Sequence, residues 1–367
     1  MLDASIELLL ARTKAEYAYT RKEAATGVTL VPLAPFLLEE TLISSPLAGL
    51  FLDSVRIEDN GVQPLGQAWH GVCVADGRLE GVRVCNNRIE GFVVGIALDD
   101  REEYAAAEAN DRLLVFDNEI RDCLVIGIAV HGDGMDIADN EIRMATMESP
   151  PALQAAIQVI GQGVRVRGNW IGVPASPATA FGVYAGIIIG DGLDDGGDSG
   201  RAVYDVELTD NRIEGAGSGD ESAIGVLIGG PQPIYDVRVR GNVIRDLGDA
   251  AVRTAGSGGW TGRIRIEDNR IENVGLGAVP DSVIAEDLSP FAAAASAVLT
   301  VGDLSLPTLL KTATTLSTPD RVAALDAVLR WAERYTLRGA ILLLQVEQGE
   351  VVGNRLSGVG RATAPEG

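Results

Sequence analysis

Acidic residues and one histidine stand at equivalent places in the sequence and are the first candidates for chemistry. Asp76, Asp99, Asp100, His131 and Asp133 each follow a short apolar run, the second example of which reads "GIAL" at 95–98. Carboxylates a few ångströms apart raise one another's pKa and can divide the roles of acid and base. We therefore predict that any catalytic group lies among Asp100, His131 and Asp133. The alternatives are a Ca²⁺ site, which takes about six to eight oxygen ligands, and plain solvation of acidic loops.

A second acidic stretch, "GDGLDDGGDSG" at 190–200, offers four carboxylates among five glycines. Glycine permits tight wrapping of the chain, but the spacing is not that of an EF-hand loop. One prediction is therefore a metal site, and the other is a flexible surface loop. The metal site would use Asp191, Asp194, Asp195 and Asp198.

Arginines and one tryptophan form a third set, predicted to lie on outward positions. Guanidinium groups recognise carboxylates, and an aromatic ring can stack on a sugar. Glu207 and Glu267 interleave with the arginines, so ion pairing between strands is the simpler alternative. The candidate set for an acidic polysaccharide is Arg165, Arg167, Trp170, Arg238 and Arg240.

All these candidates must be positioned by a repeat that runs through most of the chain. It reads "CNNRIEGF" at 85–92, "TDNRIEGA" at 209–216 and "EDNRIENVG" at 267–275. The steps between copies range from 22 residues to 85, as expected for a fixed coil lengthened by loops. One asparagine is common to the copies: Asn60, Asn87, Asn118, Asn140, Asn169, Asn211, Asn242, Asn269 and Asn354.

The residues around each asparagine predict two or three short strands in every coil. Before Asn242, Val237 and Val239 flank Arg238, and such period-2 alternation is typical of a half-buried strand. Two residues after it, Ile244 sends another apolar side chain inward. A further strand recurs with the form Gly-Ile-x-Val, as in "GIAV" at 127–130 and "GIII" at 186–189.

This pattern resembles the right-handed parallel β-helix of the pectate-lyase-like superfamily, over roughly residues 50–360. The resemblance implies strands paired one coil apart at about 4.8 Å and a stacked core of Val and Ile. It also implies an asparagine ladder, in which each amide donates to one coil and accepts from another. We expect the recurring Asn to adopt the left-handed backbone of the turn. Such solenoids include enzymes and non-catalytic scaffolds, and the galacturonase Gly-His-Gly motif is absent.

The predicted fold class is an all-β solenoid with helical additions. Residues 1–49 are assigned to an N-terminal helix, at 4–24, and a cap, because the end of a solenoid exposes its core. Coils follow at 50–280. A helical insertion at 281–337 contains helices at 289–299 and 317–335, since each begins with a capping signal. It is expected to lie on the solenoid, cap its far end or contact a partner. Residues 338–367 form the last coil and a tail.

Composition limits the partners. A net charge of −22 argues against nucleic acid and anionic membranes. The three cysteines have no disulfide or metal spacing, which favours free thiols, and Cys85 is expected to be accessible. The start has no signal-peptide pattern, and no run approaches the about 20 apolar residues of a membrane span. These features predict a cytoplasmic or particle-associated protein.

The middle residues of the Gly-Ile-x-Val strands should face outward, yet many of them are small or apolar. Such a face is expected to be covered, either by the helical insertion or by a partner or second copy of the chain. We predict an interface at Ile188, Leu227 and Leu342. The whole row is Cys73, Ala97, Ala129, Gln158, Ile188, Leu227, Arg253 and Leu342.

The sequence favours a non-catalytic structural or interaction module without a cofactor, for example in a multi-protein or phage-like particle. The alternative is a carbohydrate-active enzyme, a polysaccharide lyase or hydrolase that acts on an acidic polysaccharide with or without Ca²⁺. Few aromatic residues, 5% of the chain, and the missing enzyme motifs favour the first hypothesis.

Overall fold

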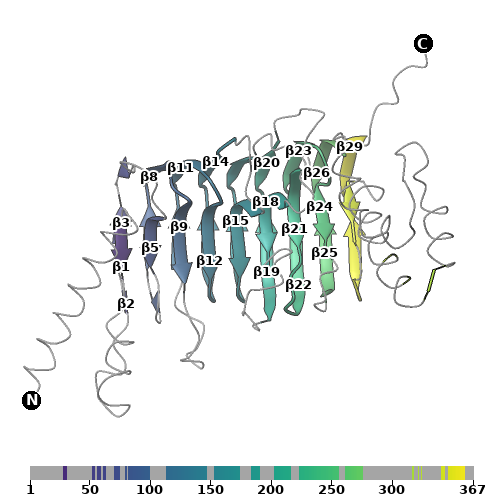
Figure 1. Ribbon diagram of the computed structural model, residues 1–367, viewed down its shortest axis with the longest axis horizontal. Helices are drawn as coiled ribbons and strands as arrows, with labels where there is room; N and C mark the ends of the chain where they lie inside the picture. Colours follow the sequence, from purple (N-terminus) through teal and green to yellow (C-terminus); the bar gives the residue numbers. More distant parts are fainter. Residues whose placement is uncertain are drawn as a thin grey trace, which may run out of the picture.

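The computed structural model shows a parallel β-helix in which successive coils stack along one axis (Figure 1). The description covers residues 28–30, 52–53, 56–58, 61–62, 70–74, 79–80, 82–99, 113–146, 153–173, 183–190, 202–215, 223–255, 261–275, 316–317, 321, 324, 340–343 and 346–359.

Three nine-stranded sheets, here called A, C and D, form the walls of the solenoid, and every strand pairs in parallel with its equivalent one coil away. Sheet A contains β1 (Val28–Leu30), β5 (His70–Val74), β9 (Val94–Asp99), β12 (Ile126–His131), β15 (Leu153–Ile160), β18 (Val183–Ile189), β21 (Ala223–Ile228), β24 (Val252–Thr254) and β27 (Ile341–Leu342).

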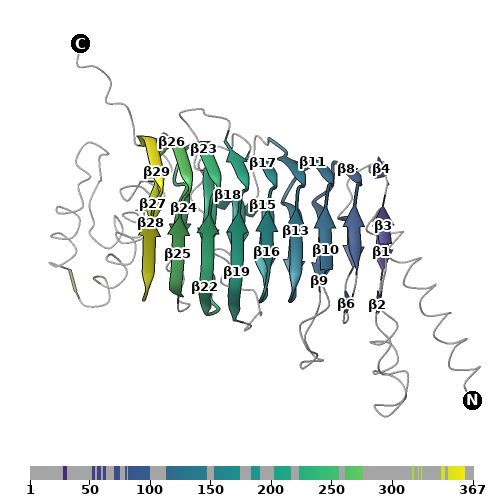
Figure 2. The same ribbon diagram turned by 180° about the vertical axis from the view of Figure 1, so that it is seen from behind.

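Sheets C and D contain the strands before and after the recurring asparagine (Figure 2). Sheet C contains β3 (Arg56–Glu58), β7 (Arg83–Cys85), β10 (Leu113–Phe116), β13 (Met135–Ala138), β16 (Arg165–Arg167), β19 (Val203–Thr209), β22 (Ile234–Arg240), β25 (Thr261–Glu267) and β28 (Gly349–Val352). Sheet D contains β4 (Gly61–Val62), β8 (Arg88–Glu90), β11 (Glu119–Cys123), β14 (Glu141–Met144), β17 (Trp170–Gly172), β20 (Arg212–Glu214), β23 (Val243–Leu247), β26 (Arg270–Val274) and β29 (Arg355–Val359). A small sheet B pairs β2 (Leu52–Asp53) with β6 (Leu79–Glu80).

The alternation of apolar and polar residues in the sequence corresponds to the alternation of buried and outward side chains in the structure. In β22, Val237 and Val239 are buried in the interior and Arg238 between them faces outward. The predicted solenoid of two or three strands per coil is therefore confirmed, with three strands in a full coil.

The first residue of the Gly-Ile-x-Val strand is glycine because the coils approach closely there. A Cβ added at Gly127 would lie 2.6 Å from the main-chain oxygen of Ala156 and 2.7 Å from Cγ2 of Ile142. Gly225 meets the same two obstacles, the oxygen of Ala251 at 2.5 Å and Cγ2 of Ile244 at 2.7 Å. The inward isoleucine that follows the asparagine turn thus requires the small residue in the neighbouring coil.

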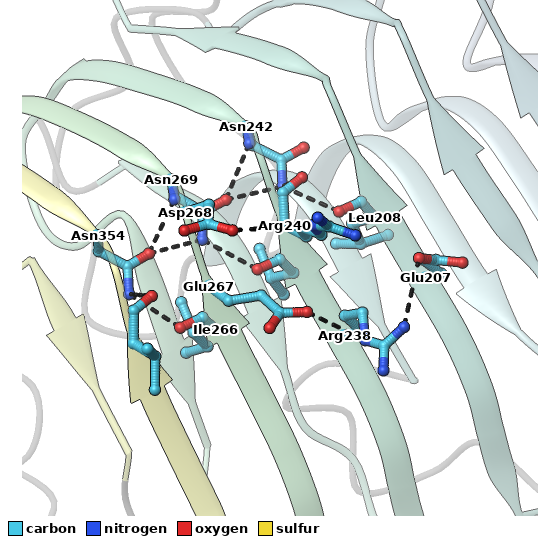
Figure 3. A network of polar contacts seen from close by, with 12 residues as sticks. Glu207, Leu208, Arg238, Arg240, Asn242, Ile266, Glu267, Asp268, Asn269 and Asn354 are labelled. Atoms are coloured by element: carbon cyan, nitrogen blue, oxygen red, sulfur yellow. Dashed lines mark hydrogen bonds and ion pairs between the residues drawn. The ribbon is translucent and has the colours of Figure 1, made fainter.

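The asparagine ladder is confirmed for the eight members within the described residues. Asn211 accepts a hydrogen bond at 2.9 Å from Nδ2 of Asn169 and donates one at 3.0 Å from its own Nδ2 to Oδ1 of Asn242. The same bond continues through Asn269 to Asn354, and the last rungs are drawn in Figure 3. The remaining rungs run from Asn87 through Asn118 and Asn140 to Asn169. Asn60 lies outside the described residues.

The expectation that the ladder asparagine itself adopts the left-handed backbone is wrong. The positive φ belongs to the residue before it, for example Asp117 (φ 54°), Asp210 (φ 54°) and Gly241 (φ 67°). The preceding residue makes the sharp turn, so the asparagine remains positioned to direct its amide inward. Its main chain also takes part, because the N–H of Asn211 donates to Oδ1 of Asn242 at 2.9 Å.

The predicted helical additions fall mostly outside the described residues. These include the helices at 4–24 and 289–299 and most of the insertion at 281–337. Within the predicted helix at 317–335, Arg321 and Ala324 have helical backbone, and the N–H of Arg321 donates to the oxygen of Ser317 at 2.8 Å.

In the part of the chain that the structure describes, there is no helix with the length and apolar character needed to cross a membrane.

Candidate functional site

The predicted catalytic set is only partly within the described residues. His131 ends β12, and its direct strand neighbours are Asp99 in β9 and Ile160 in β15. The sequence-derived alignment of His131 with Asp99 in adjacent coils is therefore correct at the level of the backbone. Asp76 and Asp100 lie outside the described residues, so the predicted catalytic set stays a prediction.

Asp133, in the turn after β12, is bound by the next coil. One carboxylate oxygen accepts from the main-chain N–H of Gln162 at 2.8 Å, and the other accepts from its Nε2 at 2.6 Å. These two donors fix the position of the carboxylate. The contacts of this side chain connect two coils.

Within the residues that are described, no group of three or more His, Cys, Asp or Glu side chains is placed to hold a metal ion. The acidic stretch with Asp191, Asp194, Asp195 and Asp198 lies outside them, so the metal site predicted there stays a prediction.

The outward arginines of sheet C are engaged in ion pairs with neighbouring strands. Arg165 donates to the main-chain oxygen of Asp205 at 2.7 Å and lies 3.2 Å from its carboxylate and 3.4 Å from that of Glu207. Arg167 binds Asp136 through two hydrogen bonds of 3.1 and 3.0 Å, and this contact raises the pKa of Arg167. Bidentate geometry of this kind makes the stronger class of ion pair.

The ion pairing continues along the same face in Figure 3. Arg238 lies 3.3 Å from Glu267 and 3.8 Å from Glu207, and Arg240 lies 3.9 Å from Asp268. The interleaved acids noted in the sequence therefore pair with the arginines, which confirms the alternative of cross-strand ion pairing. We call the outer faces of sheets C and D the charged walls.

Trp170 lies on the wall of sheet D, whereas the four arginines of its predicted set lie on sheet C. The guanidinium carbon of Arg143 is 4.5 Å from the ring centroid, a cation–π contact. A ligand that stacked on this face of the ring would have to displace Arg143.

Sequence reasoning missed an aromatic pair on sheet C. Tyr204 and Tyr235 stack with ring centroids 5.0 Å apart and planes 1° from parallel, and Arg263 lies 5.4 Å from the second centroid. The available signal was "YDV", which recurs at 204–206 and 235–237 at the same distance before Asn211 and Asn242. Each ring thus covers one face of the other, and Arg263 lies over the ring of Tyr235.

The outer face of sheet A is buried within one copy of the chain over its middle strands, from Gln158 to Arg253, whereas Ala97 and Ala129 are partly exposed. Ile188 and Leu227 are direct strand neighbours and are 0% and 1% exposed. A cluster separate from the interior contains them together with Ala155, Ala185 and Ile224. The predicted cover, the insertion at 281–337, falls almost entirely outside the described residues, so the covering segment is not identified.

Leu342, the third predicted interface residue, is half-buried, and its strand is not paired directly with the strand of Leu227. Arg253 of β24 stands between them in the row. This arginine is itself buried and pairs with Asp249 at 2.7 Å. The row therefore changes from apolar to charged within one coil.

None of the three cysteines forms a disulfide, as expected, but Cys85 is not accessible. It is 3% exposed because its outward position in β7 lies beside Phe116 in β10. Cys123 is fully buried in the core, and burial raises its pKa to about 12.

Comparison of the chain with protein-family models, with curated proteins and with solved structures gives no match.

Proposed function

We propose that the protein is a non-catalytic structural or interaction module, a β-helix of the right-handed, pectate-lyase-like kind. The supporting observation is that, among the described residues, arginines suited to sugar binding and one carboxylate suited to acid–base work are engaged within the chain. Arg167 is bound by Asp136 and Arg238 by Glu267, and both oxygens of Asp133 accept from Gln162.

An engaged side chain can bind a ligand only after it loses its present partner. A sugar carboxylate at Arg167 would have to replace two hydrogen bonds of about 3 Å that already neutralise the guanidinium. A binding site of this type therefore gains little net free energy, because one ion pair is exchanged for another. The same pairs connect successive strands and support a stiff rod.

The ladder adds to the stiffness of this rod. Each amide between Asn87 and Asn354 links its coil to the next, and these side chains are buried in all but the last coil. Fully satisfied polar networks inside a core favour one well-defined structure. Such a scaffold is suited to hold other molecules at fixed spacing, as expected of a component of a larger particle.

The test is an assay of a panel of acidic and neutral polysaccharides, with Ca²⁺ and with a chelator. We expect no new reducing ends and no unsaturated products under either condition. Turnover that is lost in His131→Ala and kept in the control Arg270→Ala would support the alternative, a carbohydrate-active enzyme. The control is suitable because Arg270 is an exposed residue of sheet D outside the candidate sets, and it pairs with Glu272 at 2.7 Å.

A further inference from the structure

The last coil exposes four large apolar side chains, three of them at positions that are buried in the preceding coil. The large hydrophobic side chains that are exposed among the described residues all lie in β28 and β29: Val351 (48%), Val352 (52%), Leu356 (54%) and Val359 (42%). In the preceding coil, the strand partners of Val351 and Leu356 are Ile266 and Ile271, both 0% exposed. Within the described residues, the interior of the solenoid is thus exposed at this end, where β28 and β29 are drawn in yellow in Figures 1 and 2.

Among the described strands, two sheet edges lie at the same end. β28 and β29 are the outermost strands of sheets C and D. Edge strands present unpaired N–H and C=O groups and readily pair with another chain. Together the two strands contain one acid, Glu350, and one base, Arg355, although the whole chain has a net charge of −22. A second copy can approach this end without strong repulsion.

The apolar pattern of this end is self-complementary. Val351 and Leu356 both face the interior, and they stand three and two residues from Asn354 on either side of the corner. A two-fold axis through the bond between Gly353 and Asn354 places position 351 of one copy opposite position 356 of a second copy. β28 of one copy then lies along β29 of the other in the opposite direction, with apolar residues facing apolar residues.

We propose that two copies of the chain associate end to end through this surface, with β28 of one copy antiparallel to β29 of the other. Val351 then lies opposite Leu356 of the second copy, and Glu350 lies opposite its Ser357. This deepens the proposed function and rests on it, since it names a second copy as the partner of the interaction module.

A second copy is the occupant that the pattern fits, because a two-fold interface uses the same patch on both subunits and closes on itself. A head-to-tail arrangement would instead join this end to the opposite end of another copy and continue as a polymer. The closed arrangement buries the exposed interior of both copies with one contact.

Sedimentation velocity of the full chain, from about 1 to about 100 µM, tests the association. We expect the wild type to shift from monomer to dimer. Leu356→Asp should raise the dissociation constant at least about 100-fold, because the interface loses this side chain from both copies. The control Val243→Asp changes a half-buried outward residue of sheet D and should leave the constant unchanged. Circular dichroism of each variant checks that it is folded.

Cysteine pairing tests the register. Residues directly opposite in antiparallel strands have Cα atoms about 4.5–5.5 Å apart, within the range of a disulfide. Under mild oxidation, a mixture of Glu350→Cys and Ser357→Cys proteins should form the mixed disulfide dimer. Neither variant alone, nor the wild type with its own three thiols, should do so to a comparable extent.

Three outcomes would overturn the inference: a monomer over the whole concentration range, a growing polymer, or a dimer that tolerates Leu356→Asp. The polysaccharide assay tests the proposed function independently of the association. A dimer that cleaves polysaccharide would remove the proposed function and leave the association, whereas an inactive monomer would do the reverse.

Discussion

Along β22, Val237 and Val239 face the interior, while Arg238 between them lies on the charged wall. The two sides of the strand differ in the kind of residue that recurs from coil to coil. Across the coils, the interior row holds similar residues, Val166, Leu208 and Val239. The neighbouring outward row alternates in sign, with Arg165, Glu207 and Arg238. Stacking in the core requires similar shape from coil to coil, whereas stacking on the wall requires complementary charge.

The outer face of sheet A does not fit this division. By its position in the strand it is a wall, yet Ile188 and Leu227 are as buried as the interior. Position in a strand therefore decides which way a side chain points, and packing outside the coil decides whether it meets water. Variants at buried sites and at sites on the charged walls separate the effect of side-chain direction from the effect of burial.

The largest effect is expected for Leu227→Asp. A carboxylate at a site that is 1% exposed has to be buried or the cover has to open, so unfolding should become easier by about 3 kcal/mol or more. Urea denaturation measures the difference. The matched variant Val243→Asp, on the wall between Arg212 and Arg270, should change stability by less than about 0.5 kcal/mol. Equal effects would show that the two faces do not differ.

Asn211→Ala is expected to have the next largest effect. The main-chain N–H of Asn169 loses its acceptor at 3.1 Å, Oδ1 of Asn211, and a buried unsatisfied group costs about 1–3 kcal/mol. Asn354→Ala removes the same type of bond at the open end, where water can replace it. At a protein concentration low enough to avoid association, its effect in urea should be less than half as large. A similar loss at both sites would argue against the buried ladder as the cause.

The thiol of Cys123 makes the interior sensitive to alkaline pH. Its pKa is raised from 9.0 to about 12 by burial, so the folded chain keeps a proton that the unfolded chain releases. This contribution to stability is intact below pH 9 and is lost as pH rises from 9 towards 12. At pH 10 the loss is about 1 kcal/mol.

Urea denaturation at pH 8 and pH 10 measures this loss. The decrease should be smaller by that amount in Cys123→Ala, and it should be unchanged in Cys73→Ala, because Cys73 is partly exposed. The same decrease in all three proteins would assign the pH dependence to other groups.

The sequence was sufficient for features that depend on local spacing. Alternation around Arg238 predicts the strand, and the recurring asparagine predicts the ladder, because each coil repeats the same local pattern of residues. The turn was assigned one residue too late, although Asp or Gly before the ladder asparagine, as at Asp210 and Gly241, carried the signal.

Contacts that depend on neighbouring coils were harder to predict. Cys85 has an outward position, and it is buried between strands of the neighbouring coils, where its partners are Phe116 and Glu58. The partners of Arg165 include Asp205, a residue at a positive φ of 53° whose position cannot be read from alternation. The predicted catalytic residues come from different loops, and the lengths of these loops vary between coils, so sequence spacing does not fix their separation.

The smallest effect is expected on the wall, and it gives the sharpest comparison because it uses adjacent residues of one strand. Arg238 has a side chain that is 43% exposed and two ion pairs of 3.3 and 3.8 Å. Exposed pairs contribute about 0–1 kcal/mol, and salt screens them, so Arg238→Ala should cost less than about 1 kcal/mol and still less in 1 M NaCl. Val239→Ala, at a site that is 0% exposed, should cost about 1.5–3 kcal/mol with little response to salt. Urea denaturation of both variants at low and high salt measures the two effects. If Arg238→Ala were the more destabilising change, the charged wall and not the stacked interior would be the main source of stability in this coil.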